Sequence, residues 1–165
     1  MLLPHFRTLA YYNAWANDKL YDACGQLSEV EYLASRPCFF GSIHSTLNHI
    51  LVADRIWISH FKHTKNGIIS FNQELYADFV GLHVARKAED ALIVNYFEGL
   101  DEEELVGWLE YVDMAGEDQV DEISTLLGHF FDRQAHHRGQ IHELLSQADA
   151  PLQSIDLINF LRERE

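Results

Sequence analysis

The chain has 165 residues, 47% of them hydrophobic, and a formal net charge of −14 with neutral histidines. This length and composition fit one domain with a substantial apolar core, spanning residues 1–165. The acidic balance disfavours nucleic acid and anionic membrane surfaces as partners, because binding to either needs clustered lysine and arginine.

The cysteines and the N-terminal residues indicate in which cellular compartment the protein is expected. Cys24 and Cys38 are the only cysteines, and their spacing makes neither a CxxC motif nor a disulfide framework. The first residues lack the basic region and apolar run of an export signal. No apolar stretch approaches the ~20 residues that a membrane-spanning helix requires. These features predict a cytoplasmic protein.

Apolar residues recur at helical spacing along most of the chain, which predicts four long amphipathic helices and two short ones. Ser42 is the expected N-cap of the second long helix, and Ser28 and Ser154 are the expected caps of the short helices. The expected bounds are about 6–24, 42–63, 76–97 and 121–147 for the long helices, and 28–34 and 156–162 for the short ones.

Glycine and proline mark the ends of these segments. Gly25 and Gly99 follow the first and third long helices, and residues 149–151 (Asp-Ala-Pro) stop the fourth. Residues 101–116 are less regular. Their acidic start favours a short helix, whereas residues 108–112 alternate as an extended segment does, with a turn at Ala115-Gly116.

These elements predict an all-α fold: a four-helix bundle with short accessory helices. A short extended hairpin before the last long helix is compatible with the same pattern. The connection between the second and third long helices is long enough to cross the end of the bundle. The four helices therefore need not alternate strictly up and down.

Histidines give the clearest functional signal. Residues 129–142 hold four of the ten histidines, and a bundle that turns imidazoles inward can build a metal or proton-transfer site. His49 on the second long helix and His137 on the fourth are the expected ligands, because both border a buried face. Neutral imidazoles suit Zn²⁺, Ni²⁺, Fe²⁺ and Cu²⁺. For any single histidine, packing or solvent exposure is the more common role.

A catalytic metal site usually needs a third protein ligand. The natural position lies one turn before His137, but Arg133 stands there and cannot bind a cation. His129 is two turns away, and His136 points about 100° away from His137 around the helix. The residues themselves therefore supply two ligands and leave the third position open.

Other polar residues have two interpretations each. Asp54 and Asp132 are placed to accept a hydrogen bond from the second nitrogen of an imidazole ligand, although caps and surface charges are commoner roles. Asn17 and Trp15 either line the pocket or pack in the core. Arg138 and Gln140 are expected to tie the fourth long helix to a neighbour. The histidines expected to be structural or exposed are His44, His60, His63 and His83.

The chain resembles the DinB/YfiT-like family of bacterial four-helix-bundle proteins. The resemblance covers nearly the whole chain in the right order, and its most specific parts are the HHRGQ stretch and the NHIL stretch followed by Asp54 and Trp57. The matching segments are residues 12–17 (YNAWAN), 41–51 (GSIHSTLNHIL), 111–116 (YVDMAG) and 130–140 (FFDRQAHHRGQ).

The resemblance implies a divalent transition metal (Zn, Ni or Fe) held by three histidines, two of which match His49 and His137. The third belongs one turn before His137, where this chain has Arg133. Three outcomes are open: a weak site completed by water, a site completed by His136, or no metal, with Arg133 in the pocket as a fixed positive charge. In the last case Arg133, with Asn17, would face a bound carboxylate or phosphate.

Two functions follow. The first is a metal-dependent hydrolase or thiol S-transferase, in which the ion activates water or a small thiol. The second is a non-catalytic module that binds a small ligand or a partner and whose metal site is degenerate because of Arg133. The resemblance also implies a homodimer.

Overall fold

Four long helices make up most of the computed structural model, which describes residues 2–148, 150 and 152–164. The all-α prediction is confirmed, with a small hairpin before the last long helix. Within these residues none of the helices has the length and apolar character needed to cross a membrane. The bounds are Leu3–Cys24 (α1), Glu29–Leu33 (α2), Ile43–Phe61 (α3), Phe79–Gly99 (α4), Glu104–Val106 (η1, a 3₁₀ turn), Trp108–Val112 (β1), Asp118–Glu122 (β2), Ile123–Gln147 (α5) and Leu157–Glu163 (α6).

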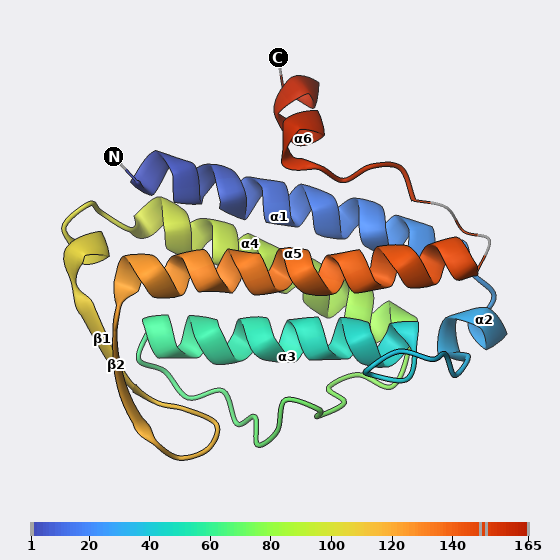
Figure 1. Cartoon of the computed structure of the whole chain (residues 1–165), viewed down its shortest axis with the longest axis horizontal. Coiled ribbons are helices and arrows are strands. Elements are labelled where there is room, and N and C mark those ends of the chain that lie inside the picture. The colour runs from blue at the N-terminus through green and yellow to red at the C-terminus, as the bar shows by residue number, and fades with distance from the viewer. Residues whose placement is uncertain (1, 149, 151, 165) are drawn as a thin grey trace.

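The long helices do not alternate up and down. α1 and α5 run one way, whereas α3 and α4 run the other way, so that α3 and α4 are parallel (Figure 1). The connection over residues 62–78 runs from the end of α3 back along the bundle to the start of α4, and it is long enough to span this distance (Figure 1). α1 and α3 each pack against both α4 and α5. This order places the middle of α3 directly beside the middle of α5, the two helices that carry His49 and His137.

Serine caps fix the start of two helices as predicted. The Ser28 hydroxyl accepts a hydrogen bond from the Glu31 backbone N–H at 3.2 Å, and the Ser42 hydroxyl accepts one from the Ser45 N–H at 3.0 Å. Such caps satisfy N–H groups that have no partner within the helix. The cap at Ser42 sets the register of α3 and therefore the direction in which His49 points.

The predicted start of the third long helix near Tyr76 is wrong, because α4 begins at Phe79. The Asn48 side-chain oxygen accepts hydrogen bonds from the backbone N–H groups of Leu75 and Tyr76, at 2.9 and 3.1 Å. These bonds keep the segment out of the helix. Asp78 then caps α4 by accepting from the Gly81 N–H at 2.8 Å. A side chain distant in sequence thus overrides a helical apolar pattern.

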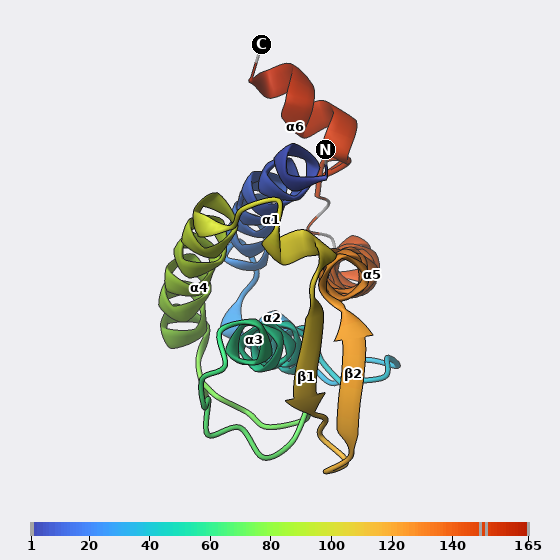
Figure 2. The ribbon, with the colours of Figure 1, turned by 90° about the vertical axis from the view of Figure 1, so that its left-hand side faces the viewer.

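The hairpin takes the first two residues predicted for the last long helix. β1 and β2 pair antiparallel, with Trp108 opposite Glu122, so α5 begins at Ile123 rather than near Asp121. The turn holds Gly116 at φ 85°, and the Asp113 carboxylate accepts from the Ala115 and Glu117 N–H groups. The hairpin lies across the end of the bundle where α3 ends and α5 begins (Figure 2).

Two other helix boundaries differ from prediction, whereas the end of α5 agrees with it. α3 ends at Phe61 rather than near His63, which has a left-handed φ of 50°. Asp156, not Ser154, is the N-cap residue of α6, because the Ser154 hydroxyl donates to the Asp156 carboxylate instead. α5 ends at Gln147, and the predicted stop at Asp149 and Pro151 lies outside the described residues.

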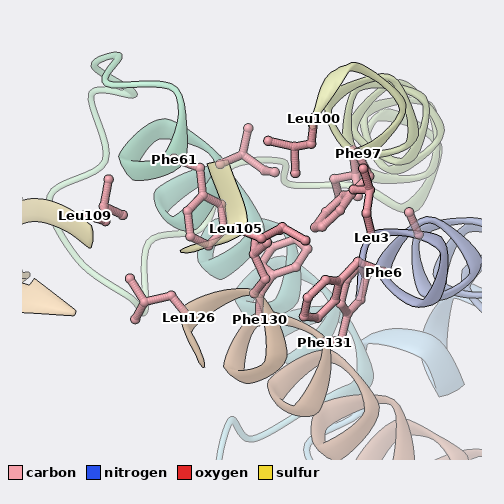
Figure 3. Packing of buried hydrophobic residues seen from close by; sticks show 14 residues of the cluster. Leu3, Phe6, Phe61, Phe97, Leu100, Leu105, Leu109, Leu126, Phe130 and Phe131 are labelled. Carbon is pink, nitrogen blue, oxygen red and sulfur yellow. The ribbon is translucent and has the colours of Figure 1, made fainter. Parts of the chain in front are cut away.

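The core consists of two apolar clusters with polar residues between them. One cluster fills the end of the bundle near the hairpin, around Phe6, Phe97 and Phe130 (Figure 3). The other cluster fills the opposite end of the bundle, around Leu20, Leu47 and Leu145. Between them each long helix contributes buried polar side chains, namely Asn13, Asn17, Asp54, Arg86, Asp90, Gln134 and Arg138. The two histidines lie at the level of this polar middle layer.

Candidate functional site

His49 on α3 and His137 on α5 face each other between the two helices. Their Nε2 atoms are 3.3 Å apart, and their rings meet nearly perpendicular, at 82°. Both side chains are buried, with 5% of His49 and 7% of His137 exposed. The structure thus brings together the two imidazoles that the sequence singled out.

Hydrogen bonds at the far side of each ring define its tautomer. His49 Nδ1 lies 2.9 Å from the Phe71 carbonyl oxygen, and His137 Nδ1 lies 2.9 Å from the Gln140 side-chain oxygen. Because these oxygens accept hydrogen bonds, each neutral ring carries its proton on Nδ1 and presents a lone pair at Nε2. Two lone pairs therefore converge on one small volume.

Arg133 places a positive charge at the point where the lone pairs meet. Its Nη2 atom lies 3.4 Å from His49 Nε2 and 3.4 Å from His137 Nε2, so the three nitrogens form a nearly equilateral triangle. The guanidinium donates to the two lone pairs that would otherwise repel each other. Within the described part of the chain Arg133 has no carboxylate partner, and its buried Nε has no hydrogen-bond acceptor.

The electrostatics of the triangle keep both imidazoles neutral. Burial lowers the pKa of His49 below 6.5, and the nearby Arg133 charge acts in the same direction, against the hydrogen bond to Phe71. Burial also lowers the pKa of His137, with His49 and Arg133 adding to the effect and Gln140 opposing it. Both rings therefore act as acceptors at neutral pH, beside one fixed cation.

A tetrahedral metal ion fits two corners of this triangle but not the third. Two nitrogen ligands each ~2.0–2.1 Å from a tetrahedral ion lie roughly 3.3–3.4 Å apart, which matches the spacing of the His49 and His137 Nε2 atoms. The third corner, however, is a guanidinium nitrogen, which has no lone pair to donate and repels a cation. Nowhere in residues 2–148, 150 and 152–164 do three His, Cys, Asp or Glu side chains gather as a metal site would require. The residues present do not fit a tightly held metal.

Phe40 covers the triangle on the side of the loop before α3. Its ring stacks on His49 at 4.1 Å between centroids and lies edge-on to His137 at 5.6 Å. A cavity of about 350 Å³ opens beside His49 and Asn48, and a second of about 460 Å³ opens beside Gln140. Both have Phe39 and Phe40 in their walls. Room for a small ligand therefore lies on either side of the aromatic cover, beside His49 and beside Gln140, whereas the cavity that Arg133 itself lines is only about 10 Å³.

The structure does not bring His136 or Asn17 to the triangle. His136 is exposed, and its ring lies 5.0 Å from that of His137 at 83°, on the wall of the larger cavity. Asn17 is 2% exposed and donates to Asp90 at 2.9 Å within the polar middle layer. Trp15 packs beneath α6, where its indole N–H donates to Glu163, rather than lining the pocket.

Neither aspartate supports an imidazole, which was the less common of the two roles weighed for them. Asp54 accepts hydrogen bonds from Arg86 at 2.6 Å and from Gln134 at 2.8 Å, and Asp132 is exposed. A buried guanidinium one helix away competes for the Asp54 carboxylate and holds it. This pairing joins α3, α4 and α5 beside the site without touching either histidine.

Two partners of the imidazoles were missed from the sequence. Gln140 was expected to reach a neighbouring helix, but it bonds to His137 on its own helix. A spacing of three residues, which places side chains on one helix face, is a signal for this pair. The Phe71 carbonyl gives no such signal, because it belongs to a loop. The prediction for Arg138 is confirmed, since it donates to Asn13 on α1.

Comparison with known proteins gives one family. The model of the DinB family matches residues 1–165, the whole chain. No curated protein matches the chain.

Proposed function

We propose that this chain, which belongs to the DinB family, binds a small oxyanion at Arg133, where the resemblance to the family leads one to expect a metal. One observation carries the proposal. The Arg133 guanidinium is half-buried and faces two neutral imidazoles, and it forms no ion pair with a carboxylate among the described residues. A buried cation without a counter-charge attracts an anion.

The donors that remain on Arg133 suit a carboxylate or phosphate. All the hydrogen bonds described for its guanidinium run from Nη2, which leaves Nη1 for a ligand oxygen, while the buried Nε is a donor without an acceptor. Guanidinium binds such oxygens in pairs, with charge-assisted hydrogen bonds. The Nε2 lone pairs of His49 and His137 are already directed at Nη2 of the same guanidinium. The ligand class is therefore a small oxyanion.

A second candidate is the metal-dependent hydrolase or thiol S-transferase. The 3.3 Å separation of the two Nε2 atoms favours it, because two ligands of one tetrahedral ion have this spacing. His49 and His137 would be the protein ligands. The position of Arg133 opposes it for the reasons of charge and donor chemistry given above.

Thermal unfolding with defined ligands separates the candidates. Phosphate, citrate, Zn²⁺ and Ni²⁺ are titrated into untagged wild-type protein, Arg133→Met and a matched control, Arg162→Met, whose arginine is exposed on α6. We expect an anion to raise the melting temperature of wild type and of Arg162→Met but not of Arg133→Met. Metal that copurifies with the wild-type protein, or stabilises it while the anions do not, would establish the second candidate instead.

A further inference from the structure

The outward face of the β1–β2 hairpin combines apolar and acidic side chains in a regular pattern. On this face, each pair of opposite residues contains one apolar and one acidic member, and all six side chains are exposed. The apolar residues form one zigzag across the two strands and the carboxylates form the other. The pairs are Trp108 with Glu122, Glu110 with Val120, and Val112 with Asp118.

The apolar members of this face have no partner within the described chain. Trp108 is 64% exposed and makes no ring–ring contact there, while Val112 and Val120 are each more than half exposed. The inner face is different: Leu109 is 3% exposed, and the Tyr111 ring packs on Trp57. A sheet with one face on the core normally turns polar residues to water on the other. A large exposed tryptophan there marks a contact surface.

Charge restricts what this surface can contact. Residues 101–122 contain ten aspartate or glutamate residues and no lysine or arginine. A second copy docked by the same face would set carboxylates against carboxylates, which is destabilising. The net charge of −14 makes the whole chain unfavourable toward another acidic surface. Complementarity therefore favours a basic partner.

We infer that this face is a docking surface for a basic segment of another protein. Arginine and lysine have apolar stems and charged heads, so one such residue fits one pair of the pattern. The stem lies on Trp108 and the head meets Glu122, or the stem lies on Val120 and the head meets Glu110. An arginine over the Trp108 ring adds a cation–π contact. The surface lies at the end of the bundle, away from the Phe40 cover of the ligand site, and the inference does not depend on the proposed function.

A labelled peptide that alternates lysine and valine is the probe, with a glutamate–valine peptide as its acidic counterpart. Fluorescence anisotropy measures binding to wild type, Trp108→Ser, Glu110→Lys and Asp22→Lys. Asp22 is exposed on α1, so Asp22→Lys makes the same change of net charge away from the hairpin. Circular dichroism checks that every variant keeps its helices.

We expect the basic peptide, and not the acidic one, to bind wild type and Asp22→Lys equally. Its affinity should fall by about tenfold or more in Trp108→Ser and Glu110→Lys, and added salt should weaken it. Equal weakening in Glu110→Lys and Asp22→Lys would reduce the interaction to net charge and overturn the inference. So would the absence of binding at low salt, or a wild-type dimer that Trp108→Ser dissociates in sedimentation experiments.

Discussion

Two arginines near the middle of the bundle have opposite surroundings. Arg86 on α4 is 2% exposed and lies between two carboxylates, 2.6 Å from Asp54 and 2.7 Å from Asp90. Arg133 on α5 lies 3.4 Å from two imidazole nitrogens and, in the part of the chain that the structure describes, meets no carboxylate. One charge is compensated within the fold, and the other is not.

This difference distinguishes an arginine that stabilises the fold from one that is a candidate for ligand binding. The Arg86 pairs belong to a network that also takes in Asn17 and Gln134, and it joins all four long helices between the two apolar clusters. A buried charge with partners on each side holds helices in register. Arg133 joins only two imidazoles, and its remaining donors are left for something outside the chain. The same residue type thus stabilises the fold in one place and, under the proposed function, binds a ligand in the other.

The largest expected effect comes from breaking the ion pairs of Arg86 with Asp54 and Asp90, which we call the compensated centre. Arg86→Met leaves Asp54 and Asp90 buried without their ion-pair partner, and removal of one member of a buried ion pair costs about 3–5 kcal/mol. Arg133→Met removes a charge that has no counter-charge, so we expect a change within about 1 kcal/mol. Urea unfolding monitored by circular dichroism measures both. A smaller loss in Arg86→Met than in Arg133→Met would contradict the comparison.

The pH dependence of the Arg86→Met defect provides its control. Burial raises the pKa of Asp90 to about 6, while Arg86 and Asn17 act to lower it. Without Arg86 the folded-state pKa rises further above the unfolded value. Lowering the pH through the folded pKa then protonates the buried carboxyl and favours the folded state. The deficit in stability should therefore shrink between pH 7 and pH 5, and a deficit that grows on acidification would exclude unpaired carboxylate as its cause.

The second-largest effect is expected from a substitution that turns Arg133, His49 and His137, which we call the uncompensated centre, into a metal site. Arg133→His places a third imidazole one turn before His137, at the corner where the guanidinium nitrogen now lies. At Zn²⁺ concentrations a hundredfold above Kd we expect about 2.7 kcal/mol of added stability, absent from wild type. Elemental analysis and thermal unfolding provide the measurements.

His49→Ala in the Arg133→His background is the matched control for this gain. It removes the ligand from α3 and should abolish the response to Zn²⁺. If Arg133→His binds no metal, the identity of this residue does not decide metal occupancy. Equal metal binding by Arg133→His and by the double variant would locate the metal elsewhere on the chain.

Most of the fold could be predicted because the helices carry their own signals. The apolar spacing of α1, α3 and α5 and the serine caps of α2 and α3 are local, and the structure follows them. The start of α4 could not be predicted in this way. It depends on hydrogen bonds from residues 75–76 to Asn48, which lies 27 residues earlier. The start of α5 was likewise placed two residues too early, because residues 118–122 pair with β1.

The two imidazoles and Arg133 could be predicted from the sequence, but most of the groups that contact the imidazoles could not. His49 and His137 border the buried faces of two helices, and the position of Arg133 one turn from His137 follows from helical geometry. The partner of Asp54 could not be predicted, because nothing local indicates that Arg86 is buried opposite it. The carbonyl of Phe71 and the ring of Phe40 come from loops, whose paths depend on tertiary packing.

The smallest expected effect tests the supports within the uncompensated centre. Gln140→Leu removes the acceptor for the His137 Nδ1 proton, which costs about 1 kcal/mol. The proton can then move to Nε2 and donate to the lone pair of His49, 3.3 Å away. We expect ¹⁵N NMR of the imidazoles to show the Nδ1–H form of His137 in wild type and a substantial Nε2–H population in Gln140→Leu.

His49 supplies the internal control, because its Nδ1 proton is held by a backbone carbonyl that the substitution does not alter. Its tautomer should stay the same in both proteins. A change at His49 that equals the change at His137 would mean that the loop has moved, and no change at His137 would mean that Gln140 does not set its tautomer. Gln140→Leu removes one neutral hydrogen bond beside Arg133, whereas Arg86→Met breaks a buried ion pair. The expected losses of stability, about 1 and about 3–5 kcal/mol, therefore differ between the surroundings of the two arginines.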